Sequence, residues 1–240
     1  MAERREPAPA SAGEAPARAP LGIDPATRSV SPYPQFHLSV MAKAPVPGKV
    51  KTRLCPPLSP DQACEVARSA LLDTLDAVAA TAAGRRVLLL DGTVGPWLPD
   101  GFEVVRQRGE GLAERLANAW SDLGQGGIQI GMDTPQVTPG LLQECLRTLA
   151  GPGVDAVLGL ADDGGWWAIG MRTPDPRVFS RVPMSTSATG KAQLRRLQDE
   201  GLRVALLPPL VDVDTVDQLS LVASSAPSGR FAGYIRSLGY

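Results

Sequence analysis

The feature that most constrains the fold is a regular alternation of short apolar runs and longer helical segments between Phe36 and the C-terminus. Apolar runs of four to eight residues are typical of buried strands, and longer segments with apolar positions three to four residues apart are typical of helices. We expect strands over residues 36–42, 86–91, 102–106, 128–132, 154–160, 165–171 and 202–207. We expect helices over 60–82, 111–123, 138–149, 187–200 and 214–224, with a short closing helix within 226–240. This order predicts an α/β fold with a mostly parallel sheet flanked by helices on both faces.

Residues 1–35 have a different composition, because proline and alanine dominate and few side chains are able to pack. We expect this segment to be a disordered leader or processing segment. The folded body then runs from Phe36 to Tyr240, which is long enough to bury a sizeable core.

Charge and cysteine content exclude several classes of protein. The 24 basic and 25 acidic residues give a net charge of −1, so no global field would attract nucleic acid or an anionic membrane surface. The three cysteines, Cys55, Cys64 and Cys145, are widely spaced and odd in number, which predicts reduced thiols in the cytoplasm. His37 is the only histidine, so an imidazole-rich metal site is excluded. We find neither a secretory signal nor the roughly 20 apolar residues of a membrane-spanning helix.

The loop after the first strand, KAPVPGKVKTRL, carries Lys43, Lys49, Lys51 and Arg53 without an acidic residue. Three of the four lysines in the chain fall here, whereas arginine is used almost everywhere else. Compact ammonium groups suit contacts with phosphate oxygens, and Gly48 would let a ligand approach the backbone closely. Ligands of such sheets bind beyond the carboxyl ends of the strands, so we expect this loop to bind phosphates. The alternative is a solvated basic loop.

Aspartates follow two of the later predicted segments. Asp133, in GMDTP, comes directly after the strand 128–132 and would face the same crevice. Asp212 and Asp214, in PLVDVDTVDQL, would lie on one side of an extended segment. Magnesium and manganese take one or two protein carboxylates together with diphosphate oxygens and water, so these aspartates are the predicted metal site. The alternatives are a turn role for Asp133 and helix capping by Asp214.

The segment LADDGGWWAIG places two carboxylates before a pair of glycines and a pair of tryptophans. A sharp turn would point Asp163 into a cleft, and Trp166 or Trp167 would supply a flat apolar wall. The alternative is a hairpin turn with core tryptophans, and one of the two is expected in the core because neighbours on a strand face opposite ways. The later segment VPMSTSATG offers hydroxyl groups around a helix start. The predicted acceptor-binding residues are Gly164, Gly165, Trp166, Ser185 and Thr186.

Taken in order, KAPVPGKVKTRL, GEGLAERL, GMDTP, ADDGGWWAIG, VPMSTSATG and DVDT closely resemble a family of small nucleotide-diphospho-sugar transferases of the GT-A type. The resemblance is to the "transferase 1" proteins associated with radical-SAM and selenodomain systems, also described as arsenosugar-biosynthesis glycosyltransferases. It runs from about residue 38 to 220. It implies one GT-A-like domain over 36–240, with a Rossmann-like nucleotide-binding half, an acceptor-binding half, and Mg²⁺ or Mn²⁺ bridging protein and diphosphate.

The resemblance also implies roles for individual residues. Those expected to hold the nucleotide phosphates are Lys43, Lys49, Lys51 and Arg53, those expected to hold the metal are Asp133 with Asp212 or Asp214, and Asp163 serves the acceptor side. The family usually has tyrosine in place of Trp166 and Trp167, and a small residue in place of Met132. These departures leave the metal residues intact and concern the acceptor.

The leading hypothesis is a metal-dependent glycosyltransferase that moves a sugar from a nucleotide diphosphate donor to a small-molecule acceptor. Asp163, with Asp162, would deprotonate the acceptor if the reaction inverts at the anomeric carbon. The alternative is a nucleotidyltransferase, similar to phospholactate guanylyltransferase, that releases pyrophosphate from a nucleoside triphosphate. The first loop lacks the L-A-G-G-x-S-x-R-x-G signature of many such enzymes. A non-catalytic nucleotide-binding module is a third hypothesis, and the presence of every charged motif residue argues against it.

Overall fold

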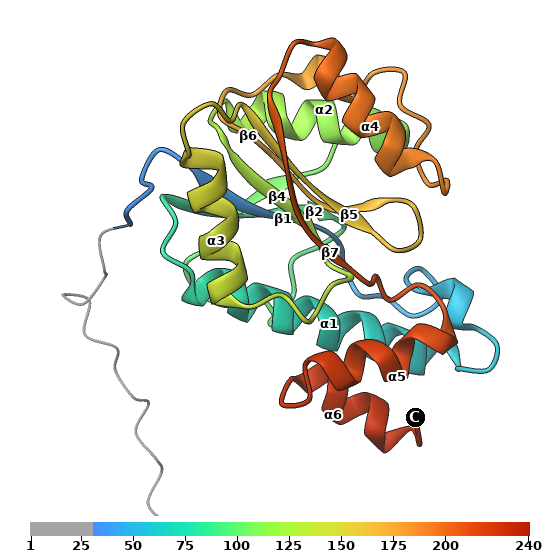
Figure 1. Ribbon diagram of the computed structural model, residues 1–240. Coiled ribbons are helices and arrows are strands. Elements are labelled where there is room, and N and C mark those ends of the chain that lie inside the picture. Colours follow the sequence, from blue (N-terminus) through green and yellow to red (C-terminus); the bar gives the residue numbers. More distant parts are fainter. Residues whose placement is uncertain (1–30) are drawn as a thin grey trace, which may run out of the picture.

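The computed structural model describes residues 31–240, and a seven-stranded sheet forms its centre (Figure 1). The strands are β1 (His37–Lys43), β2 (Arg85–Asp91), β3 (Glu103–Arg106), β4 (Gly127–Gly131), β5 (Ala156–Ala161), β6 (Trp166–Met171) and β7 (Val204–Leu210). Their spatial order is β3-β2-β1-β4-β6-β5-β7. Within these residues, β6 runs antiparallel to β4 and β5, and every other pairing is parallel.

Helices cover both faces of this sheet. They are α1 (Pro60–Ala80), α2 (Gly111–Leu123), α3 (Pro139–Ala150), α4 (Thr189–Asp199), α5 (Val216–Ser225) and α6 (Arg230–Ser237), with short 3₁₀ turns η2 (Thr52–Leu54) and η3 (Pro176–Phe179). Figure 1 shows α1 and α3 on one face, α2 and α4 on the other, and α5 and α6 beside α1. The predicted α/β fold with a mostly parallel sheet is confirmed.

Side-chain caps set several helix starts. Ser59 caps α1, because its hydroxyl accepts from the Gln62 N–H at 3.2 Å while the Gln62 side chain accepts from the Ser59 N–H at 2.8 Å. Thr138 caps α3 by accepting from the Leu141 N–H. The carboxylate of Asp73, in α1, accepts from two backbone N–H groups at the start of α6. This contact fixes the C-terminal helix to α1, since buried caps satisfy donors that a helix leaves open.

The core fills both sides of the sheet. Leu38 and Val40 of β1 pack in the cluster that includes α1 and α3, and Trp120 of α2 packs with Phe179 on the other side. His37 is fully buried with its ring 5.2 Å from that of Trp120. Burial, helped by the positive charge of Arg85, lowers the pKa of His37 to about 4. The imidazole is therefore neutral and part of the core at pH 7.

Most predicted boundaries differ by one or two residues from the observed ones, and the largest shift is in the last strand. The last strand, predicted over 202–207, begins at Val204 and continues to Leu210 through Pro208 and Pro209. Proline donates no hydrogen bond, and β7 tolerates it because this strand lies at the edge of the sheet. Residues 1–30 of the predicted leader lie outside the described residues. Of the remaining five, Ser31 donates to the Ala82 carbonyl at 2.9 Å, and Tyr33 packs against the core.

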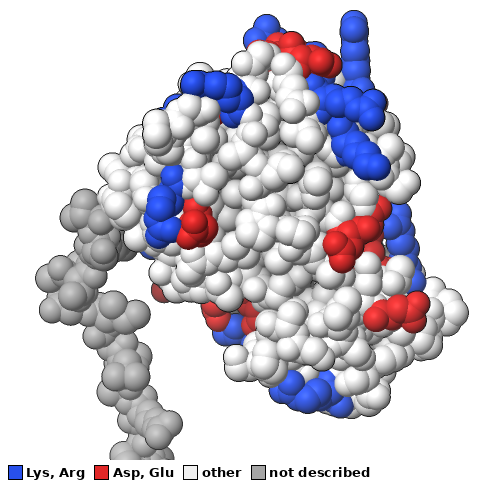
Figure 2. All heavy atoms as spheres, in the orientation of Figure 1, with Lys and Arg blue, Asp and Glu red and all other residues white. Residues whose placement is uncertain are grey.

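The surface agrees with the balanced composition. On the face seen in Figure 2, basic and acidic side chains form separate small groups around a largely uncharged centre. In the part of the chain that the structure describes, no helix is long and apolar enough to cross a membrane.

Candidate active site

The predicted site residues gather at the carboxyl edge of the sheet, where β1 lies next to β4. The strand order reverses here, because β2 and β3 lie on one side of β1 and β4 lies on the other. The register pairs Lys43 with Asp91 and Met41 with Gly131, so the loops after β1 and β4 leave the sheet side by side. Such a reversal opens the crevice in which open α/β sheets bind ligands.

Two adjoining cavities occupy this edge. The smaller has a volume of about 230 Å³ and is lined by the basic loop, including Lys43, Lys49, Lys51 and Arg53. The larger has a volume of about 500 Å³ and is lined by acidic, hydroxyl and apolar side chains. Its predicted residues are Asp133, Asp163, Gly165, Trp166, Ser185, Thr186, Asp212 and Asp214. The two cavities share a wall formed by Arg53, Met132, Asp133 and Asp214.

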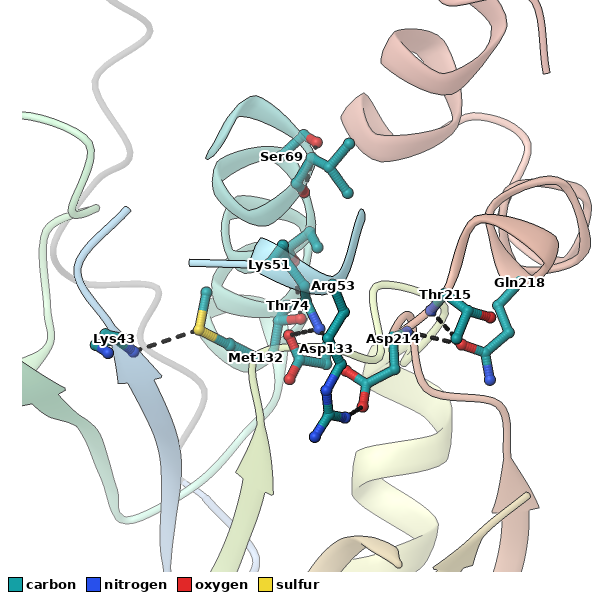
Figure 3. Close-up of polar contacts among 12 residues, drawn as sticks. Lys43, Lys51, Arg53, Ser69, Thr74, Met132, Asp133, Asp214, Thr215 and Gln218 are labelled. Carbon is teal, nitrogen blue, oxygen red and sulfur yellow. Dashed lines mark hydrogen bonds and ion pairs between the residues drawn. The ribbon is translucent and has the colours of Figure 1, made fainter. Parts of the chain in front are cut away.

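An ion-pair cluster lies at this shared wall, with the buried ammonium of Lys51 at its centre (Figure 3). The Lys51 Nζ lies 2.7 Å from Asp133 Oδ1 and 3.1 Å from Asp214 Oδ1. Arg53 Nη1 lies 2.9 Å from the other oxygen of Asp214. Figure 3 shows Lys43 apart from this cluster, with its backbone N–H donating to the Met132 sulfur at 3.3 Å.

The electrostatics of the cluster keep Lys51 charged. Its side chain is only 8% exposed, and burial alone would lower the pKa of an ammonium group. The charges of Asp133 and Asp214 outweigh burial, so the pKa of Lys51 lies above its usual value. Burial likewise works to raise the pKa of Asp214, but Lys51 and Arg53 hold it below its ordinary value. Lys51 and Asp214 therefore form a charged pair at neutral pH.

Backbone contacts bring the two acidic motifs together. The Val213 N–H donates to the Asp133 carbonyl at 3.1 Å, which joins the loop after β4 to the segment after β7. Thr215 is the N-cap residue of α5, and the Gln218 side chain accepts from the N–H groups of Asp214 and Thr215. Helix capping by Asp214, the alternative from sequence, is not observed, and its carboxylate faces Lys51 and Arg53.

Asp212 completes a concentration of negative charge in the larger cavity. Burial, followed by the charges of Asp133 and Asp163, raises the pKa of Asp212 to about 7. Within residues 31–240, no three His, Cys, Asp or Glu side chains already form a metal cluster. Magnesium is nevertheless usually held by one or two protein carboxylates plus substrate phosphates. Asp133 and Asp212 fit that donor set better than Asp214, because two cations already neutralise Asp214.

The turn between β5 and β6 carries the residues predicted to face the acceptor. The two strands form an antiparallel pair, so the hairpin considered from sequence is present, and Asp163 Oδ1 accepts from the Gly165 N–H at 2.7 Å. Gly164 has φ +89°, and a Cβ there would lie 2.1 Å from the Ser187 carbonyl oxygen. The turn therefore packs directly on the loop before α4, which carries the predicted hydroxyl groups.

Both tryptophans contribute to the lining of the larger cavity, but they differ in burial. Trp166 is partly exposed, whereas Trp167 is 1% exposed and its indole N–H donates to the Pro208 carbonyl at 2.9 Å. Asp162 is exposed, and neither it nor Gly164 lines either cavity. Gly48 is also exposed and lines neither, and a Cβ there would meet nothing within 4 Å.

Sequence reasoning missed the apolar end of the larger cavity. This end is lined by Met41, Leu112, Leu116, Gln129 and Met184. Gln129 is 1% exposed on β4, and its side-chain oxygen has no hydrogen-bond partner among the described residues. The available signal was a single polar residue inside the apolar run GIQIG. The other lining residues look like ordinary core positions in the sequence.

Comparison with known proteins supports this picture. Residues 68–186, just under half of the chain, match the family DUF2064, described as an uncharacterized protein conserved in bacteria. A search of curated proteins gives no match. The crystal structure of a candidate nucleotide-diphospho-sugar transferase from Desulfovibrio desulfuricans G20 is 27% identical, with a TM-score of 0.76 over 85% of this chain and 94% of that one. The resemblance to nucleotide-diphospho-sugar transferases of the GT-A type is confirmed.

Two more distant structures show the same fold. A cytidylyltransferase from Leptospira borgpetersenii serovar Hardjo-bovis is 12% identical, with a TM-score of 0.55 over 85% of this chain and 94% of that one. The protein Rv0371c from Mycobacterium tuberculosis H37Rv is 21% identical, with a TM-score of 0.51 over 82% of this chain and its own entire length. At such identities the likeness concerns the fold alone.

Proposed function

We propose that this protein is a metal-dependent glycosyltransferase that moves a sugar from a nucleotide diphosphate donor to a small-molecule acceptor. The observation that carries the proposal is the shared wall between a basic cavity and an acidic, hydroxyl-lined cavity. A diphosphate in the basic cavity would place the sugar at the wall formed by Asp133 and Asp214. The acceptor would then approach from the larger cavity.

The residues divide the chemistry between them. The ammonium groups of Lys43, Lys49 and Lys51 and the guanidinium of Arg53 neutralise the diphosphate, which makes it a better leaving group. A divalent cation held by Asp133 and Asp212, the proposed ligands, would supply further charge stabilisation to the same oxygens.

Asp163 is the proposed general base. Its carboxylate lines the larger cavity and contributes to the field at Asp212. In an inverting transfer, Asp163 takes the proton of an acceptor hydroxyl as that oxygen bonds to the anomeric carbon and the bond from this carbon to the diphosphate oxygen breaks. Asp162, the second predicted base, lines neither cavity, so Asp163 alone carries this role in the proposal.

One observation favours a nucleotidyltransferase as the second candidate. Four basic residues line a cavity of only about 230 Å³, and that density of positive charge would also suit a triphosphate. In that reaction, an acceptor oxygen attacks the α-phosphate and pyrophosphate leaves. The two activities share the site and differ in their products.

Ligand binding offers the first test. Thermal unfolding is measured with Mn²⁺ or Mg²⁺ across sugar nucleotides and nucleoside triphosphates, because a ligand at 100 times its dissociation constant stabilises a protein by about 2.7 kcal/mol. We expect metal-dependent stabilisation by a sugar nucleotide, lost in Asp133→Ala and kept in the control Asp217→Asn. Asp217 is exposed and lines neither cavity. Stabilisation by triphosphates alone would overturn glycosyl transfer.

Product analysis offers the second test. With the donor identified, release of a nucleoside diphosphate supports glycosyl transfer, and release of pyrophosphate from a triphosphate supports the alternative. We also propose a cytoplasmic location, which the three free cysteines support because such thiols persist in reducing compartments.

A further inference from the structure

Lys51 differs from its neighbours in the basic loop. Lys49 and Thr52 are exposed, and the Arg53 side chain is 71% exposed, whereas the Lys51 side chain is 8% exposed. Its backbone is left-handed, with φ 48° and ψ 36°, a conformation that few residues other than glycine adopt without strain. The fold therefore holds this one ammonium group inside the shared wall at a conformational cost.

The ammonium of Lys51 lies between two carboxylates, in a place that would also suit a metal cation. It lies between one oxygen of Asp133 and one of Asp214, at 2.7 and 3.1 Å. Among the described residues, Lys51 is the only ion-pair partner of Asp133. A divalent ion bound to Asp133 would meet this positive charge at close range.

We propose that Lys51 is a built-in counter-ion that withholds Asp133 from the divalent cation until a diphosphate draws the ammonium away. This inference rests on the proposed function, since it concerns the order in which the metal and the nucleotide occupy the site. In this arrangement the bound metal raises the affinity for the nucleotide and the bound nucleotide raises the affinity for the metal. Each ligand favours the state in which Lys51 has left Asp133.

The surroundings fit a movement of this side chain and not of its partners. Lys51 also lines the smaller cavity, so phosphate oxygens there would offer its ammonium new partners without passage through the core. Lysine carries its charge on a flexible four-carbon stem, which permits such a reorientation. Arg53 continues to hold Asp214 when Lys51 leaves. The exchange therefore frees Asp133 in particular.

The test measures Mn²⁺ binding directly, from the spin-resonance signal of the free ion. The full chain, Lys51→Met and Lys191→Met are each titrated with Mn²⁺ alone, then with saturating UDP, GDP or ADP. Lys191→Met is the matched control, because it removes the same charge from an exposed position of α4 that lines neither cavity. We expect Lys51→Met to bind Mn²⁺ alone at least about tenfold more tightly than the natural chain, because a like charge is removed from the site.

The natural chain should gain about tenfold in Mn²⁺ affinity when a nucleoside diphosphate binds, and Lys51→Met should lose this coupling. Lys191→Met should match the natural chain both with Mn²⁺ alone and with a nucleoside diphosphate. If Lys51→Met binds Mn²⁺ no more tightly, or if the natural chain binds a nucleoside diphosphate and still takes up no Mn²⁺, the inference is overturned.

Two features keep the experiment decisive. Should Lys51→Met fail to fold, Lys51→Gln removes the charge and keeps a polar N–H donor at this position, so it replaces Lys51→Met in the same titrations. Failure of every nucleoside diphosphate to bind would count against the proposed function, while the Mn²⁺-only comparison would still decide the role of Lys51. If Lys51 had only a structural role, Lys51→Met would not bind Mn²⁺ more tightly than the natural chain.

Discussion

In the smaller cavity the buried ammonium of Lys51 is paired with two carboxylates, whereas in the larger cavity the charges of Asp133 and Asp163 act against the ionisation of Asp212. Both cavities are built from loops at the same edge of the sheet. The comparison indicates which charge each side would accept from a ligand. On the basic side Lys51 is already paired, while Lys43 and Lys49 form no ion pair among the described residues and suit an anion. On the acidic side a cation would relieve the repulsion at Asp212.

The largest expected effect comes from breaking the wall between the cavities. Asp133→Ala removes the carboxylate that contacts Lys51. In the proposed function this carboxylate also binds the metal, so turnover should fall by about a thousandfold or more. The unfolding free energy should change by no more than about 1 kcal/mol, because Asp214 still pairs with Lys51. Steady-state rates with urea unfolding check both values. Full activity at saturating metal would refute the role of Asp133.

Two glycine substitutions compare the backbone of the turn between β5 and β6 with that of the basic loop after β1. In Gly164→Ala the new Cβ would lie 2.1 Å from the Ser187 carbonyl oxygen at a positive φ, so we expect a loss of about 3 kcal/mol in unfolding free energy. Gly48 also has a positive φ but open space around it, and Gly48→Ala should cost about 1 kcal/mol. Urea unfolding measures both. Equal losses would contradict the close packing of the turn on the loop before α4.

The pH dependence of stability tests a buried group outside both cavities. The pKa of His37 is about 4 in the folded chain, and an unfolded imidazole has a pKa near 6.5. As the pH falls below about 6.5 the unfolded chain takes up this proton first, so stability should drop by about 2 kcal/mol between pH 7 and pH 5. Urea unfolding of the natural chain and of His37→Phe measures this drop. The same drop in the variant would assign it to other groups.

The smallest expected effect separates the two tryptophans. Trp167→Phe removes the donor to the Pro208 carbonyl from the core, and should cost about 1 to 2 kcal/mol in unfolding free energy. Trp166→Phe should cost less than about 1 kcal/mol, because Trp166 is partly exposed and its indole N–H has no hydrogen-bond partner to lose among the described residues. In the proposed function, it should instead raise the KM for the acceptor. A larger loss of stability in Trp166→Phe would place that ring among the core residues.

Sequence patterning predicted the fold well because each element carries its own signal. The apolar runs predicted the strands, and apolar positions three to four residues apart predicted the helices. The sequence prediction ended β7 too early, because prolines normally end a strand. Only the spatial order of the sheet shows that this strand lies at the edge. The antiparallel direction of β6 likewise depends on pairing, which a single segment does not encode.

The candidate site was predictable in its members and not in their pairing. Motif by motif, the sequence predicts a phosphate loop with Lys51 and a metal residue at Asp133. That Lys51 binds Asp133 directly, at 2.7 Å, depends on two loops 82 positions apart in the chain meeting at one edge. Asp162 and Asp163 are adjacent and chemically identical, so only the geometry of the turn separates the one that lines the cavity from the one that does not.

The wall shared by the two cavities also has a consequence for inhibition. A molecule with a diphosphate at one end and a hydroxyl-bearing group at the other could occupy both cavities through a linker that crosses Asp133 and Asp214. Once one end binds, the other meets its cavity at an effective concentration in the millimolar range. Two weak fragments joined in this way would bind far more tightly than either alone, with no contact beyond those that each fragment already makes.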